Sequence, residues 1–232
     1  MKAMKEICIL GLRLRDYSLR EKMQLTEKYL HNGILNTIEC ITAQTVMRAV
    51  EDEQQKRWLE EMDLVVCCDA DVAYAAGVAS HGRLKEIENN SFLKEFIRRL
   101  SREMQTVYLI ADGEETLNGL MDDLREMAGM LRIAGCGILH AELTEGGIAT
   151  LVNDINDKAP GVLLSLCDYP LQESFIHENK GIINANVWVG LQKGCPIQGE
   201  EAKGLRMLAR KLERRVFARR VTRYENQEQA EP

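Results

Sequence analysis

An amide and a carboxylate stand side by side after an apolar run, in the stretch GVLLSLCDYPLQESFIHEN (residues 161–179). The first six residues predict a buried strand and the last nine predict a helix, which puts Gln172 and Glu173 in the first helical turn. A glutamine amide offers a donor and an acceptor in one plane, as the imide edge of uracil requires, and a carboxylate can accept from both ribose hydroxyls. The pair would therefore suit a nucleoside pocket. In the simpler interpretation, which these letters alone favour, Glu173 stabilises the positive end of the helix and Gln172 is solvated.

Two further acids follow the apolar run DLVV, in the stretch CCDADVAYAAG. A carboxylate at the end of a strand could act as a general base toward a sugar hydroxyl. Asp69-Ala70-Asp71 could instead hold a magnesium or manganese ion bound to a diphosphate, because these ions prefer oxygen ligands. The simpler interpretation, again favoured on the letters alone, is that Asp69 caps the following helix and Asp71 lies in its first turn.

Two more strand-to-helix turns carry weaker signals. In YLIADGEETLNG, Asp112-Gly113 forms a tight bend, and two glutamates at the helix start would repel a phosphate, so we interpret it as a capped turn. In RIAGCGILHAELTEGG, Gly135 and Gly137 would let the backbone approach a ligand, and Thr144 is the expected cap of the next helix.

The elements that must position these turns alternate regularly along the chain. Short apolar runs predict strands at EICILGL, LNTIECIT, DLVVCC, TVYLIA, LRIAGC, GVLLSL and NVWVGL. Between them lie helical patterns: SLREKMQLTEKYL with a Ser18-x-x-Glu21 capping box, AQTVMRAVEDEQQKRWLEEM, NSFLKEFIRRLSREM beginning at an Asn cap, EETLNGLMDDLREMAGML and TEGGIATLVNDIND. This alternation predicts an α/β fold whose mainly parallel sheet carries helices on both faces. In such a sheet, ligands bind at the carboxyl ends of the strands.

Composition limits the class of protein. The 232 residues include 45% hydrophobic ones, enough for a large core, and no run of 18 apolar residues. The start MKAMKEICIL lacks an apolar run of signal-peptide length, and the seven cysteines lack a disulfide spacing, so we expect a cytoplasmic protein. We predict one domain over residues 1–191, then a linker, a basic helix and a polar tail over 192–232.

The basic helix concentrates the positive charge. Residues 204–223 hold eight basic residues and one acid, so this segment is +7 while the rest is −13. An acidic body with a basic tail is unlike a nucleic-acid-binding domain. Apolar residues form a stripe between arginines that include Arg206, Arg210 and Arg214, a pattern that suits an anionic membrane surface or a helix packed on acidic protein.

The order of these pieces resembles the WecG/TagA/CpsF glycosyltransferases, glycosyltransferase family 26. Residues 151–191 carry the family's Ile-Asn, Pro-x-Gln-Glu and strand-final glycine, matched here by Asn156, Pro170, Gln172, Glu173 and Gly190. Upstream, the stretch DLVVCCDADVAYAAG resembles the family's Asp-Gly segment, and LRIAGCGILH, with Gly135, falls where its Gly-x-His-His segment belongs.

The resemblance implies a Rossmann-like fold and transfer of an N-acetylmannosamine-type sugar from a UDP donor to a polyprenyl-linked acceptor. The family inverts the anomeric centre without a metal or other cofactor. It would make Asp69 the base, with Thr42 matching a neighbouring motif position, and would bind the donor at Gln172 and Glu173. Arg206, Arg210 and Arg214 would contact phosphate or the inner face of the cell membrane, in a possible homo-oligomer.

Several positions depart from the family pattern. Without a gap, Cys68 falls on the catalytic Asp, and one inserted residue restores Asp69. Asp168 replaces a glycine, and its charge would repel a diphosphate by about 1–4 kcal/mol at ~4 Å. The alternative function is therefore an inactive family member that binds a nucleotide or a partner.

Overall fold

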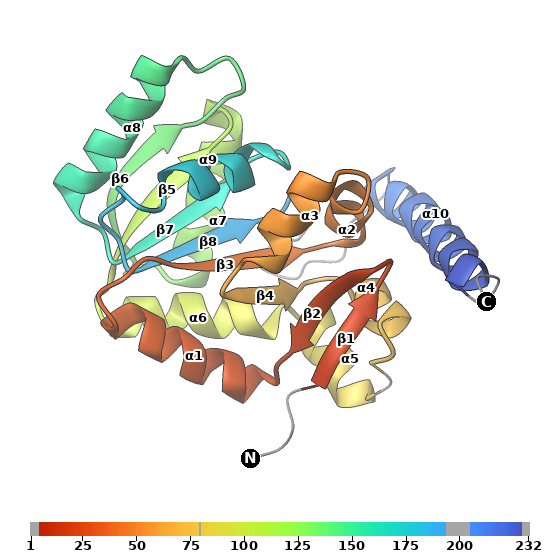
Figure 1. The fold of residues 1–232 in the computed structure, drawn as a ribbon. Coiled ribbons are helices and arrows are strands. Elements are labelled where there is room, and N and C mark those ends of the chain that lie inside the picture. The colour runs from red at the N-terminus through yellow and green to blue at the C-terminus, as the bar shows by residue number, and fades with distance from the viewer. Residues whose placement is uncertain (1–4, 79, 194–204, 229–232) are drawn as a thin grey trace.

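The computed structural model describes residues 5–78, 80–193 and 205–228 (Figure 1). Within these residues six strands form one parallel sheet, in the order β4-β3-β8-β7-β5-β6. The strands are β3 (Asn36–Ile41), β4 (Leu64–Cys67), β5 (Thr106–Ala111), β6 (Arg132–Ile138), β7 (Val162–Leu166) and β8 (Val187–Leu191). The predicted fold class, a Rossmann-like α/β protein with a parallel sheet, is confirmed.

Helices cover both faces of the sheet. One face carries α1 (Leu19–His31), α6 (Ser91–Arg102) and α7 (Glu114–Met127). The other carries α2 (Ala43–Ala49), α3 (Glu53–Glu60), α8 (Glu145–Lys158) and α9 (Leu171–Asn179). Successive strand residues such as Trp188 and Val189 belong to opposite cores, which is why the central strands are apolar at consecutive positions.

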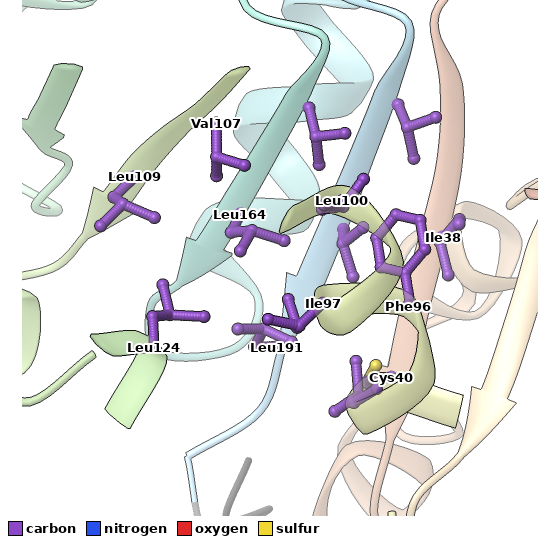
Figure 2. Packing of buried hydrophobic residues seen from close by; sticks show 14 of the residues in the cluster. Ile38, Cys40, Phe96, Ile97, Leu100, Val107, Leu109, Leu124, Leu164 and Leu191 are labelled. Atoms are coloured by element: carbon purple, nitrogen blue, oxygen red, sulfur yellow. The ribbon is translucent and has the colours of Figure 1, made fainter. Parts of the chain in front are cut away.

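The core under α6 shows how a sequence stripe becomes packing. Phe96, Ile97 and Leu100 lie on the face of α6 that meets the sheet (Figure 2). There they pack in one cluster with strand residues that include Ile38, Leu164 and Leu191. Burying side chains of this size contributes about 1.5–3 kcal/mol each, so this face anchors the strands whose ends form the site.

The first apolar run does not join the main sheet. Residues Leu10 and Gly11, both with positive φ, form a tight turn between β1 (Lys5–Ile9) and β2 (Leu12–Asp16). These two strands pair antiparallel and form a separate two-stranded sheet. Leu12 and Leu14 point into the core while Arg13 and Arg15 are exposed, the alternation expected of a sheet with one solvated face.

Two helix predictions need correction. The stretch AQTVMRAVEDEQQKRWLEEM is two helices, because α2 ends before Val50 and Asp52 caps α3 by accepting hydrogen bonds from the N–H groups of Gln54 and Gln55. Asn90 does precede α6, but its side chain makes no capping hydrogen bond, and its backbone is left-handed with φ 48°. The Ser18–Glu21 capping box of α1 is confirmed.

The C-terminal helix α10 (Leu205–Glu228) packs beside α2 and near α4 (Ala70–Ala75) (Figure 1). Phe217 is 1% exposed and lies in a core cluster with Ile41, Val46 and Val72. Arg220 pairs with Glu51 at 2.7 Å, so arginines of the helix meet acids of the body, one of the two predicted arrangements. In the described part of the chain, no helix is both long and apolar enough to cross a membrane.

Candidate functional site

The strand order reverses in the middle of the sheet, at a place that we call the switch point. The chain leaves β3 through α2 on one face and leaves β5 through α7 on the other, and β8 and β7 end between these two helices. A crevice opens at such a point because the two connections diverge, and ligands of open α/β sheets bind there. The residues that follow β7 and β8 are therefore the first to consider.

A polar hollow of about 290 Å³, partly open to solvent, lies at this point. Three segments line it: residues of α2, the turn after β7 and the residues after β8, namely Gln44, Thr45, Arg48, Cys167, Asp168, Tyr169, Gln192 and Lys193. Arg48 also donates from Nη1 to the carbonyl of Tyr169 at 2.9 Å, which ties α2 to the turn. The hollow thus has two cations, Arg48 and Lys193, at its wall.

Lys193 pairs with two acids at this point of the fold. Its ammonium pairs with Asp112 and, at 3.2 Å, with Asp168, whose backbone N–H donates to Asp112 at 3.1 Å. Burial alone would raise the pKa of Asp112, but the bonds from Lys193 and Thr116 hold that pKa below its usual value. The same acids raise the pKa of Lys193 against the effect of burial. The charge of Asp168, which we expected to repel a diphosphate, is therefore offset in part by a cation that Asp168 shares with Asp112.

Gln172 and Glu173 lie in the first turn of α9, as predicted, but both are buried, with 0% and 1% exposure. Oε1 of Gln172 accepts from Ser165 Oγ and from the N–H of Cys167, each at 3.0 Å. Nε2 of Gln172 donates to the carbonyl of Leu191 at 3.1 Å and to Glu173 at 3.2 Å. The amide thus joins the ends of β7 and β8 from beneath the hollow, and direct contact with a nucleoside stays a prediction that requires these bonds to open.

Glu173 is half of a buried carboxyl pair whose other member is Glu39 of β3. Nε2 of Gln192 donates to Glu39 at 2.6 Å and to Glu173 at 3.1 Å, and Oε2 of each glutamate is buried without a hydrogen-bond partner. Burial raises the pKa of Glu173 to about 7. Burial, with the charge of Glu173 added, raises that of Glu39 well above its ordinary range. The pair therefore retains a proton at neutral pH.

Gly190 has no side chain, and Glu39 occupies the space that a side chain would fill. It lies opposite Glu39 in the register of β3 and β8, and a Cβ at this position would overlap Glu39 and the Trp188 ring. This packing gives the predicted substrate-binding glycine a structural role beneath the hollow.

Asp69 and Thr42, the two predicted catalytic residues, lie next to each other at the ends of β4 and β3. Asp69 caps α4 by accepting from the N–H of Asp71 at 2.9 Å, and its second oxygen accepts from the N–H of Ala43 at 3.3 Å. Thr42 caps α2 through a reciprocal pair of bonds with Thr45. Neither residue lines the hollow, but Gln44 and Thr45, which follow Thr42 on α2, do.

Asp71 contacts the C-terminal helix. It pairs with Arg214 Nε at 2.5 Å, and its pKa is raised, first by burial and then by the charge of Asp69. No cluster of three or more His, Cys, Asp or Glu able to hold a metal ion is found over the described ranges. The side chains of Arg206 and Arg210, like the predicted linker at 194–204, lie outside the described residues.

The remaining predicted residues are dispersed. The Tyr169–Pro170 peptide is cis, and Pro170 is the N-cap of α9, beside the hollow. Asn156 bonds to the carbonyl of Ile182 and the N–H of Asn184, just before β8, so it lies near the amino ends of the strands. Gly135 sits within the edge strand β6, where a Cβ would meet the Tyr108 ring.

The residues of this region that were not predicted include Glu39, Arg48, Gln192 and Lys193. A signal existed for three of them. Glu39 is an acid inside the apolar run LNTIECIT. Gln192 and Lys193 directly follow the run NVWVGL, and ligands bind at the carboxyl ends of such strands, which we call the strand-end rule. Arg48 lies on the exposed side of a helix, and only the fold brings it to the turn after β7.

A parallel α/β sheet with a polar hollow at its switch point defines the class of open-sheet α/β proteins that bind ligands there. A comparison with protein families matches residues 7–221 to the glycosyl transferase WecG/TagA/CpsF family. The chain belongs to this family, which supports a glycosyltransferase-like function in cell-surface polysaccharide synthesis. No curated protein matches the chain.

Proposed function

We propose that this protein transfers an N-acetylmannosamine-type sugar from a UDP donor to a lipid-linked acceptor, with inversion and without a metal. The observation that carries the proposal is the hollow at the switch point, where Arg48 offers charge-assisted hydrogen bonds to a diphosphate. Lys193, which pairs with Asp112 and Asp168, is a second cation on the same wall. Gln192 and Thr45 add polar groups to the same wall. Gln172 and Glu173 support this wall by fixing the ends of β7 and β8.

Asp69 is the base in this proposal. The N–H groups of Ala43 and Asp71 orient its carboxylate just after the end of β4, and Thr42 directly precedes Ala43. A base in this position takes the proton from the acceptor hydroxyl as that oxygen attacks the sugar carbon and UDP departs.

The test is turnover of UDP-N-acetylmannosamine with an acceptor sugar, which supplies the hydroxyl, linked to a short-chain polyprenyl diphosphate; turnover is measured by the release of UDP. We expect Asp69→Asn to lower turnover by about 100-fold or more, the usual contribution of a general base, while UDP binding stays within about twofold. Turnover by Asp69→Asn equal to that of the wild type would remove Asp69 as the base.

A second candidate function is a catalytically inactive member that binds a nucleotide or a partner. The observation that favours it is the closed network around Gln172, whose donors and acceptors are all satisfied within the protein. UDP binding without turnover of any UDP-sugar would support this function.

We further propose that α10 places the protein on the inner, anionic surface of the cell membrane. Arg215, Arg219 and Arg223 recur along α10 and are exposed, whereas Arg214 and Arg220 pair with acids of the body. Near an anionic surface each such cation contributes about 1 kcal/mol.

Changing the three exposed arginines to glutamine should therefore abolish sedimentation with vesicles that contain anionic lipid. The matched control removes the same charge from three exposed positions elsewhere, Arg13, Arg15 and Arg20. Equal sedimentation of the two triple variants would contradict membrane binding through α10.

A further inference from the structure

A second hollow lies beside β4, between α1, α6 and the short helix α5 (His81–Glu88). Its volume is about 310 Å³, part of which is open to solvent. The polar groups around it include Lys22 of α1, Arg83 and Glu86 of α5, and the start of α6. None of the residues that line it lines the hollow at the switch point, so it is separate from the proposed donor site.

Lys22 is a buried cation at the wall of this hollow. Its side chain is 5% exposed, and its ammonium makes no hydrogen bond or ion pair with any residue that the structure describes. Burial lowers the pKa of Lys22, and the charge of Arg83 lowers it further, against smaller opposing effects of Cys67, Cys68 and Asp16. Its nitrogen is not among the fully buried polar atoms that lack a partner in the described residues, so the ammonium reaches the open part of the hollow, where a counter-ion can approach it.

Arg83, which lines the same hollow, does have partners for its charge. It pairs with Asp16 and with Glu86, each at 2.6 Å, and donates to the carbonyl of Tyr17 at 2.5 Å. The carboxylates near the hollow are therefore used by Arg83. The charge left without a counter-charge is that of Lys22.

The start of α6 adds a second set of donors to the same hollow. Asn90, Ser91, Phe92 and Leu93 all line it, and the Asn90 side chain does not cap the helix. The first N–H groups of a helix have no partner within the helix, and the peptide dipoles give this end a partial positive charge. The residues at the start of this 12-residue helix line the hollow that Lys22 also lines.

We propose that this hollow binds a phosphate-type oxyanion between the Lys22 ammonium and the N–H groups at the start of α6. A tetrahedral oxyanion accepts hydrogen bonds from several directions, which suits donors that converge from two helices. The anion supplies the counter-charge that Lys22 lacks. Free phosphate and the phosphate of a lipid headgroup share this chemistry.

The test is calorimetric titration of the full chain with inorganic phosphate in a phosphate-free buffer. Lys22→Met keeps the apolar stem and removes the charge, and we expect it to weaken phosphate binding at least tenfold. Lys22→Arg should restore part of the affinity. The matched control is Lys28→Met, which removes a charge from an exposed position of the same helix and should leave binding unchanged.

Two further measurements distinguish the possible ligands and the two hollows. Phosphate should raise the thermal midpoint of the wild type and of Arg48→Gln, which alters only the other hollow, but not that of Lys22→Met. Tighter binding of glycerol phosphate than of inorganic phosphate would identify a lipid headgroup, and the reverse order would identify free anion. Absence of phosphate binding in the wild type, or equal binding by Lys22→Met, would overturn the proposal.

Discussion

Glu39 and Glu173 show how single side chains beneath the hollow are linked to its wall. Gln192 donates to both carboxyl groups, and it is also one of the residues that line the hollow. Two carboxyl groups that share one buried place cannot both ionise without a large cost, so one proton stabilises the arrangement. The residues that line the hollow after β8 therefore depend on a protonated acid below them.

The carboxyl pair makes stability depend on pH. The pKa of Glu173 rises from 4.5 to about 7 on folding, and that of Glu39 rises in the same direction. A raised pKa in an acid means that stability is highest below pH 4.5 and is lost as pH increases toward 7 and above. Glu39→Gln mimics the protonated form, so it should be more stable than the wild type at pH 8 by about 1–3 kcal/mol.

The measurement is urea unfolding at pH 5 and pH 8. At pH 5 the two proteins should agree within about 0.5 kcal/mol, because most of the pair is then protonated in the wild type. Glu115→Gln, an exposed acid of α7, serves as the control and should show no pH-dependent difference. A wild type and a Glu39→Gln variant that lose equal stability between the two pH values would contradict the shared proton.

At the scale of elements, the central part of α10 anchors this helix to the body of the protein. Phe217 enters a core cluster together with residues of β1, β2, α2 and α4, and Val221 and Tyr224 pack against the same cluster. Tyr224 also approaches Gly11 in the turn between β1 and β2. Arg214 and Arg220 add ion pairs at the rim, which contribute little by comparison with this burial.

Phe217→Ala should therefore release α10 from the body, since removing a buried aromatic ring costs about 3–5 kcal/mol. The expected result is faster trypsin cleavage at the arginines of α10, with the body remaining folded by circular dichroism. Val216→Ala, at a neighbouring residue that is 48% exposed, is the control and should be cleaved like the wild type. Unchanged cleavage of Phe217→Ala would show that the helix is held in another way.

At the scale of the whole molecule, the strand-end rule explains what the sequence could predict. Apolar runs and caps located the strands of the main sheet and the positions of Asp69, Gln172 and Glu173, because these signals are local, whereas Thr42 was found through the family pattern. The orientation of the Gln172 amide depends on Leu191, from a different strand, which no local pattern contains. The family motif grouped Asn156 with the site. Asn156 lies near the end of α8, however, and a helix that connects two parallel strands runs back along the sheet, so Asn156 lies at the amino ends of the strands, opposite the hollow.

The central claim is that the hollow between α2 and the ends of β7 and β8 receives a UDP moiety. Calorimetric titration of UDP tests it most directly, with Arg48→Gln as the variant and Arg57→Gln, on the adjacent helix α3, as the matched control. We predict that the wild type and the control bind one UDP per chain, and that Arg48→Gln binds about tenfold more weakly, a loss of about 1.4 kcal/mol. A wild type that does not bind UDP, or an Arg48→Gln variant with wild-type affinity, would contradict it.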